Sequence, residues 1–168
     1  MGMILTIDDF EVGRTKIALD PEQEIDLEEY IDKVENTYLP MLFGKNLYDL
    51  FKFSYQNPPL TNRFQIVFAP FTFQDDKVLI QSIGMTEMLK CFVYYLYLRD
   101  DVTRSTTIGL ERVIGENTES VTAIGHDLTS RYNEGVDAFQ TIQYYMNTFD
   151  FANYPEFNGV HLSYANIY

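Results

Sequence analysis

The side chains that most often carry catalysis are few in this sequence. It contains one cysteine, Cys91, and two histidines, His126 and His161. His126 precedes Asp127, whose carboxylate could orient an imidazole, but both residues fall near the polar side of an amphipathic segment, which favours a solvated surface. Cys91 lies in an apolar run, where burial would raise the pKa of the thiol and reduce its reactivity. These residues indicate no nucleophilic or acid–base site.

Three pairs of adjacent aspartates are the remaining candidates for chemistry with a metal ion. They are Asp8-Asp9, Asp75-Asp76 and Asp100-Asp101. A calcium or magnesium site needs several converging oxygen ligands at defined spacing, and turns and helix ends explain paired aspartates more simply. The sequence also has no zinc-type Cys/His spacing, glycine-rich phosphate loop or nucleophile elbow. We expect no enzyme activity, no cofactor and no metal; a metal-assisted hydrolase that uses one Asp pair is the least favoured alternative.

Length and charge limit the remaining classes of function. A chain of 168 residues is the size of one domain, and its net charge of −13 repels nucleic-acid phosphates and anionic membrane surfaces. The longest apolar stretch, residues 88–98, is shorter than the roughly 20 residues that cross a bilayer. The amino terminus does not resemble a secretory signal. We therefore expect one domain with no affinity for membranes and none for nucleic acid through its overall charge.

The negative charge is concentrated in residues 1–35, which carry 11 acidic and 3 basic side chains. A helix is predicted over residues 21–39, because Pro21 suits a first helical turn and apolar residues recur every three or four positions. Its acidic face consists of Glu22, Glu29 and Asp32. Ile25 lies at the centre of that face, either as a harmless exposed residue or as a contact with another chain.

Periodicity predicts three further helices. Residues 46–55 form a short one. Residues 82–99 form a helix that is apolar around nearly its whole circumference, which indicates burial on most sides and a central place in the bundle. Residues 121–149 repeat apolar side chains at spacings of three or four, which predicts one long amphipathic helix. Within it, Gly135 could allow a bend or a close helix approach, or be a tolerated mid-helix glycine.

Two segments between the helices show a different pattern. Residues 64–80 alternate between apolar and polar side chains, and residues 75–77 form a plausible turn, which predicts a β-hairpin. Residues 103–114 are rich in Thr, Val and Ile and predict an extended loop or edge strand. The expected fold class is therefore mainly α: a bundle of about four helices over residues 1–150, with a small β-hairpin or extended insertion and an irregular C-terminal tail.

Beyond Asp150 the helical pattern ends and an aromatic tail, residues 151–168, begins. We predict that its aromatic side chains bind a partner, because buried aromatic anchors usually carry interface energy, and that the domain folds without them. These residues, with Ile25, are the predicted partner-binding set: Phe151, Tyr154, Phe157, Tyr164 and Tyr168. Phe and Tyr make up 15% of the chain, which fits either interfaces with other chains or a Tyr-rich core.

Several segments also carry a family resemblance. They are residues 4–10 (ILTIDDF), the positions Tyr30-Ile31, 38–42 (YLPML), Gly44 and Leu47-Tyr48, residues 84–100 (GMTEMLKCFVYYLYLRD) and residues 132–136 (YNEGV). Together they span most of the chain in order, and they resemble the head-to-tail connector (adaptor) proteins of tailed bacteriophages, particularly those of phages of gut Bacteroidetes. None of these segments is a catalytic motif, and residues 64–80 depart from the plain helical bundle of such adaptors.

The resemblance implies a structural virion protein that assembles as a ring of about twelve copies between portal and tail and seals the DNA exit channel. Its partners would be other copies of itself, the portal protein and tail or other neck proteins, with DNA only as non-specific passing cargo. Its location would be the virion neck, after assembly in the bacterial host cytoplasm. An acidic face turned toward the lumen would keep DNA from adhering. The alternative is a soluble helical protein-binding module without a viral role.

Overall fold

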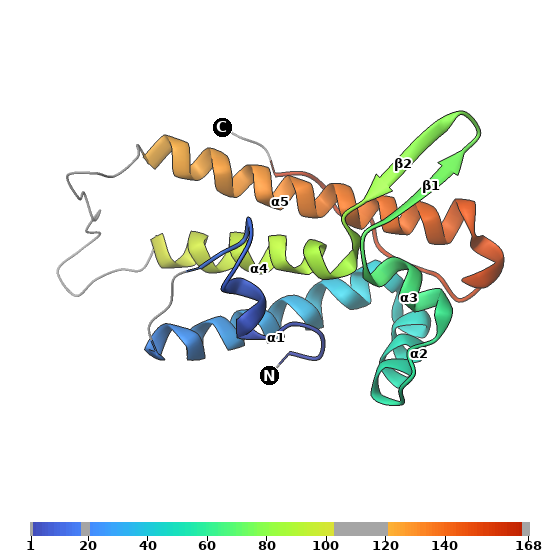
Figure 1. The fold of residues 1–168 in the computed structure, drawn as a ribbon, viewed down its shortest axis with the longest axis horizontal. Helices are drawn as coiled ribbons and strands as arrows, with labels where there is room; N and C mark the ends of the chain where they lie inside the picture. The colour runs from blue at the N-terminus through green and yellow to red at the C-terminus, as the bar shows by residue number, and fades with distance from the viewer. Residues whose placement is uncertain (1, 18–20, 103–120, 166–168) are drawn as a thin grey trace.

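Three long helices form the body of the molecule in the computed structural model, which describes residues 2–17, 21–102 and 121–165 (Figure 1). They are α1 (Pro21–Phe43), α4 (Gly84–Val102) and α5 (Val121–Tyr144). All three run along the longest axis, and α4 lies between the other two in this view. The described residues are thus mainly helical with one small hairpin, as the sequence predicts. The prediction for residues 103–114 lies outside the described residues.

The core lies where these three helices meet. Each helix contributes an apolar stripe at spacings of three or four, and the members that are almost fully buried include Leu27, Ile31, Val34, Leu42, Met88, Leu89, Phe92, Val93, Val136, Phe139 and Ile142. Burial of side chains of this size stabilises the fold by roughly 1.5–3 kcal/mol each. No side chain from 84 to 98 is exposed, so α4 is the central helix, as predicted.

Gly135 allows α5 to approach α4 closely. A Cβ atom built on Gly135 would lie 2.8 Å from Cε1 of Phe92 and 3.2 Å from Cβ of Cys91. Both distances are shorter than ordinary van der Waals contact, so a larger residue would force the helices apart. Of the roles predicted for Gly135, the close helix approach is confirmed.

Helix α1 does not end before Pro40 but continues through it to Phe43. Proline in a helix interior costs about 3 kcal/mol, because it removes one backbone hydrogen bond and crowds the preceding turn. Leu42 and Phe43 follow it and are fully buried, which offsets that cost. Gly44 follows the last residue of the helix; it has a φ of 73°, and its amide donates to the Pro40 carbonyl at 2.9 Å.

Two short helices, α2 (Lys45–Gln56) and α3 (Asn62–Phe68), pack at one end of the bundle. The Phe51 and Phe64 ring centroids lie 5.3 Å apart, and both rings also contact Phe43 of α1. The Ser54 and Thr61 hydroxyls, 2.7 Å apart, join the two ends of the connecting loop. This aromatic cluster fixes the corner from which the hairpin departs.

The hairpin consists of β1 (Phe71–Asp75) and β2 (Val78–Ser82), paired antiparallel with Phe73 opposite Ile80. It projects from the body past α5 (Figure 1). The predicted hairpin is confirmed, but its predicted start at Phe64 is wrong, because residues 64–68 belong to α3. Phe64 and Val67 are one helical turn apart and both buried, and Phe64 packs on Phe43 of α1 and Phe51 of α2. This packing selects a helix over the short alternation in the sequence.

The carboxy-terminal tail packs against its own domain. After the π-helical turn η2 (Tyr145–Phe149) and the 3-10 turn η3 (Phe151–Asn153), it runs back over α1 and α5. The amide of Asn158 donates to the Phe43 carbonyl at 3.2 Å, and that of Val160 to the Met41 carbonyl at 2.7 Å. The tail is irregular, as predicted. No helix in the described residues is long and apolar enough to cross a membrane.

Candidate functional site

The residues with the greatest catalytic potential do not converge. Cys91 is buried in α4, and burial, with a smaller contribution from Glu134, raises the pKa of its thiol to about 12. His126 and His161 are both exposed, on α5 and in the tail. Among the described residues, no three His, Cys, Asp or Glu side chains gather in a way that could hold a metal ion.

A polar hollow of about 280 Å³ lies between α1, α2 and the amino-terminal segment. Its lining includes Asp32, Glu35, Tyr48 and Lys52. Glu35 is only 3% exposed, and its carboxylate accepts the backbone N–H groups of Ile4 at 2.9 Å and Leu5 at 2.7 Å, as well as that of Met3. This carboxylate is therefore engaged in holding the amino-terminal segment on the bundle.

The outer face of α1 carries the predicted acidic residues. Glu29 is exposed, whereas Asp32 is half-buried at the rim of the polar hollow. Ile25 is 65% exposed, and its neighbours Glu24 and Glu28 are exposed with it. The backbone of residue 22 belongs to α1, but the Glu22 side chain lies outside the described side chains. The described part of this face is thus acidic with one apolar side chain.

The predicted partner-binding residues of the tail separate into two kinds. Tyr154 is 2% exposed and its hydroxyl donates to the Arg63 carbonyl, so the prediction that it binds a partner is wrong: it is a core residue of its own chain. Phe157 is half-buried against the core. Phe151 is 66% and Tyr164 49% exposed, although the Tyr164 hydroxyl donates to Asp137 at 2.7 Å. Tyr168 lies outside the described residues.

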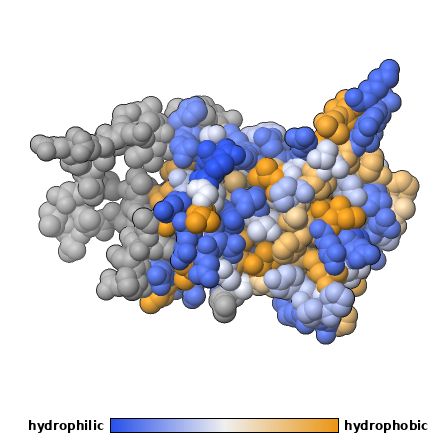
Figure 2. Space-filling model, viewed as in Figure 1, coloured by the Kyte–Doolittle hydropathy of each residue, from blue (hydrophilic) through white to orange (hydrophobic). Residues whose placement is uncertain are grey.

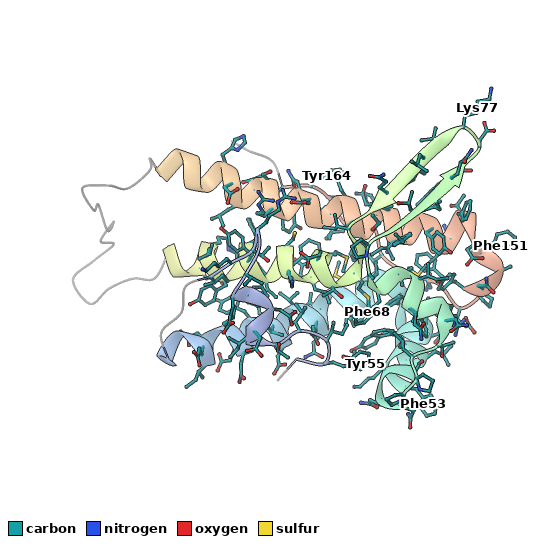
Figure 3. All side chains as sticks on the ribbon, viewed as in Figure 1. Phe53, Tyr55, Phe68, Lys77, Phe151 and Tyr164 are labelled. Atoms are coloured by element: carbon teal, nitrogen blue, oxygen red, sulfur yellow. The ribbon has the colours of Figure 1, made fainter. Side chains whose placement is uncertain are left out.

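Exposed apolar side chains also lie on the hairpin and in the turns η2 and η3, and of these the sequence had singled out only Phe151. We call the exposed apolar side chains of these elements the hairpin surface. They are Val78 and Leu79, which the strand alternation places on opposite faces of the hairpin, with Phe149 in η2 and Phe151 in η3. Figure 2 shows hydrophobic residues along the β2 side of the projecting hairpin and hydrophilic ones along β1 and the tip. Figure 3 places Lys77 at the tip and Phe151 at the same end of the body.

Contacts with η2 and with the last residue of α5 hold the hairpin in place. The Phe73 ring lies 4.8 Å from that of Phe149 and 5.1 Å from that of Tyr145, measured between centroids. Farther out, the Tyr144 hydroxyl donates to the Asp75 carboxylate, and this hydrogen bond raises the pKa of the phenol. An isolated two-stranded hairpin is only marginally stable in water, so these contacts position its outer half.

The alternation of the strands decides which hairpin side chains face outward. Phe73 and its partner Ile80 point to the α5 side, which places Leu79 and Gln74 on the opposite, open face. Asp76 makes the turn with a φ of 52°, a conformation that Asp tolerates better than most residues. The apolar pair Val78 and Leu79 directly after the predicted turn was the available sequence signal for this surface.

A second exposed apolar pair lies on α2. Leu50 is 39% and Phe53 68% exposed, and their spacing of one helical turn makes them neighbours on the helix surface. We call this pair the α2 face. The charged neighbour of Phe53 one helical turn away is the exposed Asp49, which pairs with Lys45 at 3.2 Å. Phe53 points away from the body at the end of α2 in Figure 3.

Comparisons with protein-family models, curated proteins and solved structures found no match to this chain. The arrangement of exposed side chains is therefore the basis for a functional proposal. Exposed apolar groups of this kind bind other macromolecules more readily than small substrates, because they lie on projecting elements rather than in a concave pocket.

Proposed function

We propose that this chain is a structural subunit of the neck of a tailed bacteriophage, where it forms a ring that joins the portal to the tail and surrounds the DNA exit channel. It has no catalytic role in this proposal. The resemblance of its sequence segments to head-to-tail connectors is the starting point. The single structural observation that supports it best is the projecting hairpin, on which Val78 and Leu79 are 61% and 62% exposed.

A closed ring of identical subunits needs two different surfaces on each copy, one that meets the next copy and one that meets the previous copy. The hairpin surface and the α2 face are two such surfaces on separate elements. The projecting arm exposes two apolar side chains, Val78 and Leu79, and exposed apolar groups often mark contacts with other macromolecules. Their exposure supports burial against other copies, the portal or a tail protein.

The charge of the chain suits a channel through which DNA passes. The net charge is −13, and Glu24, Glu28 and Glu29 are exposed on α1. A lumen lined by such a face repels phosphates, so DNA moves through it as non-specific cargo without binding. The same charge opposes adhesion to anionic membranes, and the proposed location is the virion neck.

Co-expression with the portal protein encoded by the same genome tests this proposal. We expect the two proteins to co-purify as a ring-shaped complex by light scattering and electron microscopy, and the chain to be detected in purified virions by mass spectrometry. A chain that neither associates with the portal nor occurs in virions contradicts the proposal. The portal is included in the measurement because a connector can form its ring only in the presence of the portal.

A helical protein-binding module without a viral role is the second candidate, and Phe151 favours it. This side chain is 66% exposed on the tail, where it could anchor a receptor. The two candidates differ in their neighbouring genes: a connector gene lies beside portal and capsid genes, whereas a cellular binding module does not require them.

A further inference from the structure

The last described part of the tail is held mainly through its backbone. We call residues 158–165 the tail strap; it forms no helix or strand and runs back along α5 (Figure 1). The amide of Asn158 donates to the Phe43 carbonyl at 3.2 Å, and that of Val160 to the Met41 carbonyl at 2.7 Å. The strap therefore begins against the last turn of α1.

Side-chain amides of α5 bind the rest of the strap. Asn133 accepts the backbone N–H of Ala165 at 2.9 Å and donates to the carbonyl of the same residue at 3.3 Å. Gln140, two helical turns farther along the same side of α5, donates to the Leu162 carbonyl at 2.8 Å. We call the groups that bind the strap the tail-binding surface: the carbonyls of Met41 and Phe43 and the side chains of Asn133, Asp137, Gln140 and Gln143.

Two positions of the strap restrict which segments this surface accepts. A Cβ atom on Gly159 would overlap the Leu42 carbonyl oxygen and Nε2 of Gln143, so this position takes only glycine. Tyr164, which lies beside α5 in Figure 3, donates its hydroxyl to the Asp137 carboxylate at 2.7 Å. The tail-binding surface thus recognises an extended segment with a glycine and, five residues later, a tyrosine.

We propose that the tail-binding surface of one copy binds the tail strap of a second copy in exchange for its own. The structure holds the kind of segment that this surface binds, and another copy supplies an identical segment with the same glycine and tyrosine. Exchange reproduces every contact of the strap, which makes it a low-cost route to association. The inference goes beyond the proposed ring function, because it uses only contacts within this chain.

The strap can detach while the rest of the tail stays in the core. Tyr154 is only 2% exposed, whereas Val160 and Tyr164 are 55% and 49% exposed. Hydrogen bonds that water can replace contribute little net free energy, and segments with few buried apolar contacts open locally. Because the opened strap leaves the buried Tyr154 in place, its release does not require the domain to unfold.

The short connection to Tyr154 decides how exchanging copies must lie. Residues 155–157 join this anchor to the strap, and the amide of Phe157 donates to the Tyr154 carbonyl at 3.0 Å in a turn. Three residues span at most about 10 Å, so two copies that exchange straps must lie in direct contact near this turn. Assembly on a common partner would raise the effective concentration of neighbouring straps and favour the exchange.

Mixing two complementary variants of the full chain tests the exchange. In Gly159→Ala the strap no longer fits, but the tail-binding surface is intact. In the double variant Asn133→Ala/Gln140→Ala the surface is impaired, but the strap is intact. We expect each variant alone to be a monomer by light scattering, and their mixture to form a heterodimer.

A chain that carries all three substitutions is the matched control, because it offers neither an intact strap nor an intact surface. Mixed with Gly159→Ala, it should form no heterodimer. If Gly159→Ala does not fold by circular dichroism, Val160→Pro replaces it, because proline lacks the amide that donates to the Met41 carbonyl. Two folded complementary variants that stay monomeric when mixed overturn the proposal.

A labelled peptide of residues 155–165 provides a second measurement by fluorescence anisotropy. It should bind the Gly159→Ala chain at least about tenfold more tightly than the wild-type chain, in which the chain's own strap occupies the surface. Equal affinity for the two chains overturns the proposal. Neither measurement includes the portal, so a failure here leaves the proposed ring function intact, and a failure to associate with the portal leaves the exchange intact.

Discussion

The hydroxyl of Tyr154 donates a hydrogen bond to the backbone carbonyl of Arg63, which ties the carboxy-terminal tail to α3. The ring of Tyr154 is buried beside that of Tyr145, with centroids 6.2 Å apart. Arg63 also reaches back to the tail, donating to the Asn153 carbonyl at 2.9 Å and pairing with Glu156 at 3.1 Å. The first part of the tail is therefore integrated into the domain.

We predict that Tyr154→Ala lowers the free energy of unfolding by about 3–5 kcal/mol, because it leaves a cavity where a large aromatic side chain was buried. Tyr154→Phe removes the hydroxyl alone and should cost about 0.5–1.5 kcal/mol. Urea denaturation measures both. Phe151→Ala, at an exposed tail position, is the control and should change stability by less than about 0.5 kcal/mol. Equal stabilities of Tyr154→Ala and Phe151→Ala would contradict a core role for Tyr154.

One side chain, Glu35, accepts three backbone N–H groups of the amino-terminal segment, so its replacement should loosen that segment. Glu35→Gln keeps the shape but has one acceptor oxygen in place of two, so a buried backbone N–H loses its partner at a cost of about 1–3 kcal/mol. Hydrogen exchange should become faster at the Met3 amide, whose acceptor is Oε2, and at the Ile4 and Leu5 amides, which share Oε1, because the segment is held less firmly. Glu29→Gln, an exposed position on the same helix, is the matched control. Unchanged exchange at all three amides in Glu35→Gln would show that other contacts hold the segment.

The close contact of α4 and α5 predicts that Gly135→Ala is destabilising although alanine is the better helix former. The added methyl group must displace the Phe92 ring, and such overpacking typically costs about 1–3 kcal/mol, against a propensity gain of about 1 kcal/mol. Ser130→Ala, at an exposed position of α5, provides the comparison. Thermal melting measures both, and a Gly135→Ala protein more stable than wild type would mean that the helices adjust freely.

Stability should fall in alkaline solution. Burial raises the pKa of the Cys91 thiol from 9.0 to about 12 and that of the Tyr38 phenol from 10.0 to about 12. Between the unfolded and folded pKa values the unfolded chain has released these protons while the folded chain retains them. The unfolded state then binds fewer protons, so the free energy of unfolding decreases as the pH rises from about 9 to about 12.

Urea denaturation at about pH 8 and at about pH 11 measures this linkage. Cys91→Ala should show a smaller decrease between the two conditions than the wild-type chain, because one of the groups with a raised pKa has been removed. Lys77→Ala, at the exposed hairpin turn, serves as the control and should leave the decrease as it is. A Cys91→Ala protein with the full wild-type decrease would show that the thiol makes no contribution.

Some elements could be predicted because their pattern is long. Helices α1, α4 and α5 each repeat apolar side chains over several turns, and the buried circumference of α4 follows directly from its apolar composition. The hairpin was predictable from its turn residues. The boundary at residues 64–68 was not, because a short apolar run fits a strand and a helical turn equally well until Phe64 meets Phe43 and Phe51.

The candidate surfaces were only partly predictable. Exposure of Ile25 and Phe151 follows from their polar or irregular surroundings, and the structure describes both as exposed. Burial of Tyr154 depends on contacts with Arg63 of α3 and Tyr145 of η2, which the pattern of neighbouring residues in the sequence does not indicate. The exposure of Phe53 could not be predicted from the sequence either, because an aromatic residue on a short amphipathic helix is more often buried.

By itself, the sequence determined one acidic, mainly helical domain, because helical periodicity and charge are properties of residues near one another along the chain. Only the tertiary structure decided that the tail closes over α1, that Glu35 binds three amides of the amino-terminal segment and that the hairpin extends past α5 with Val78 and Leu79 exposed. These features join positions far apart in the chain, and their free energies depend on burial and close packing that exist only once all the elements are assembled.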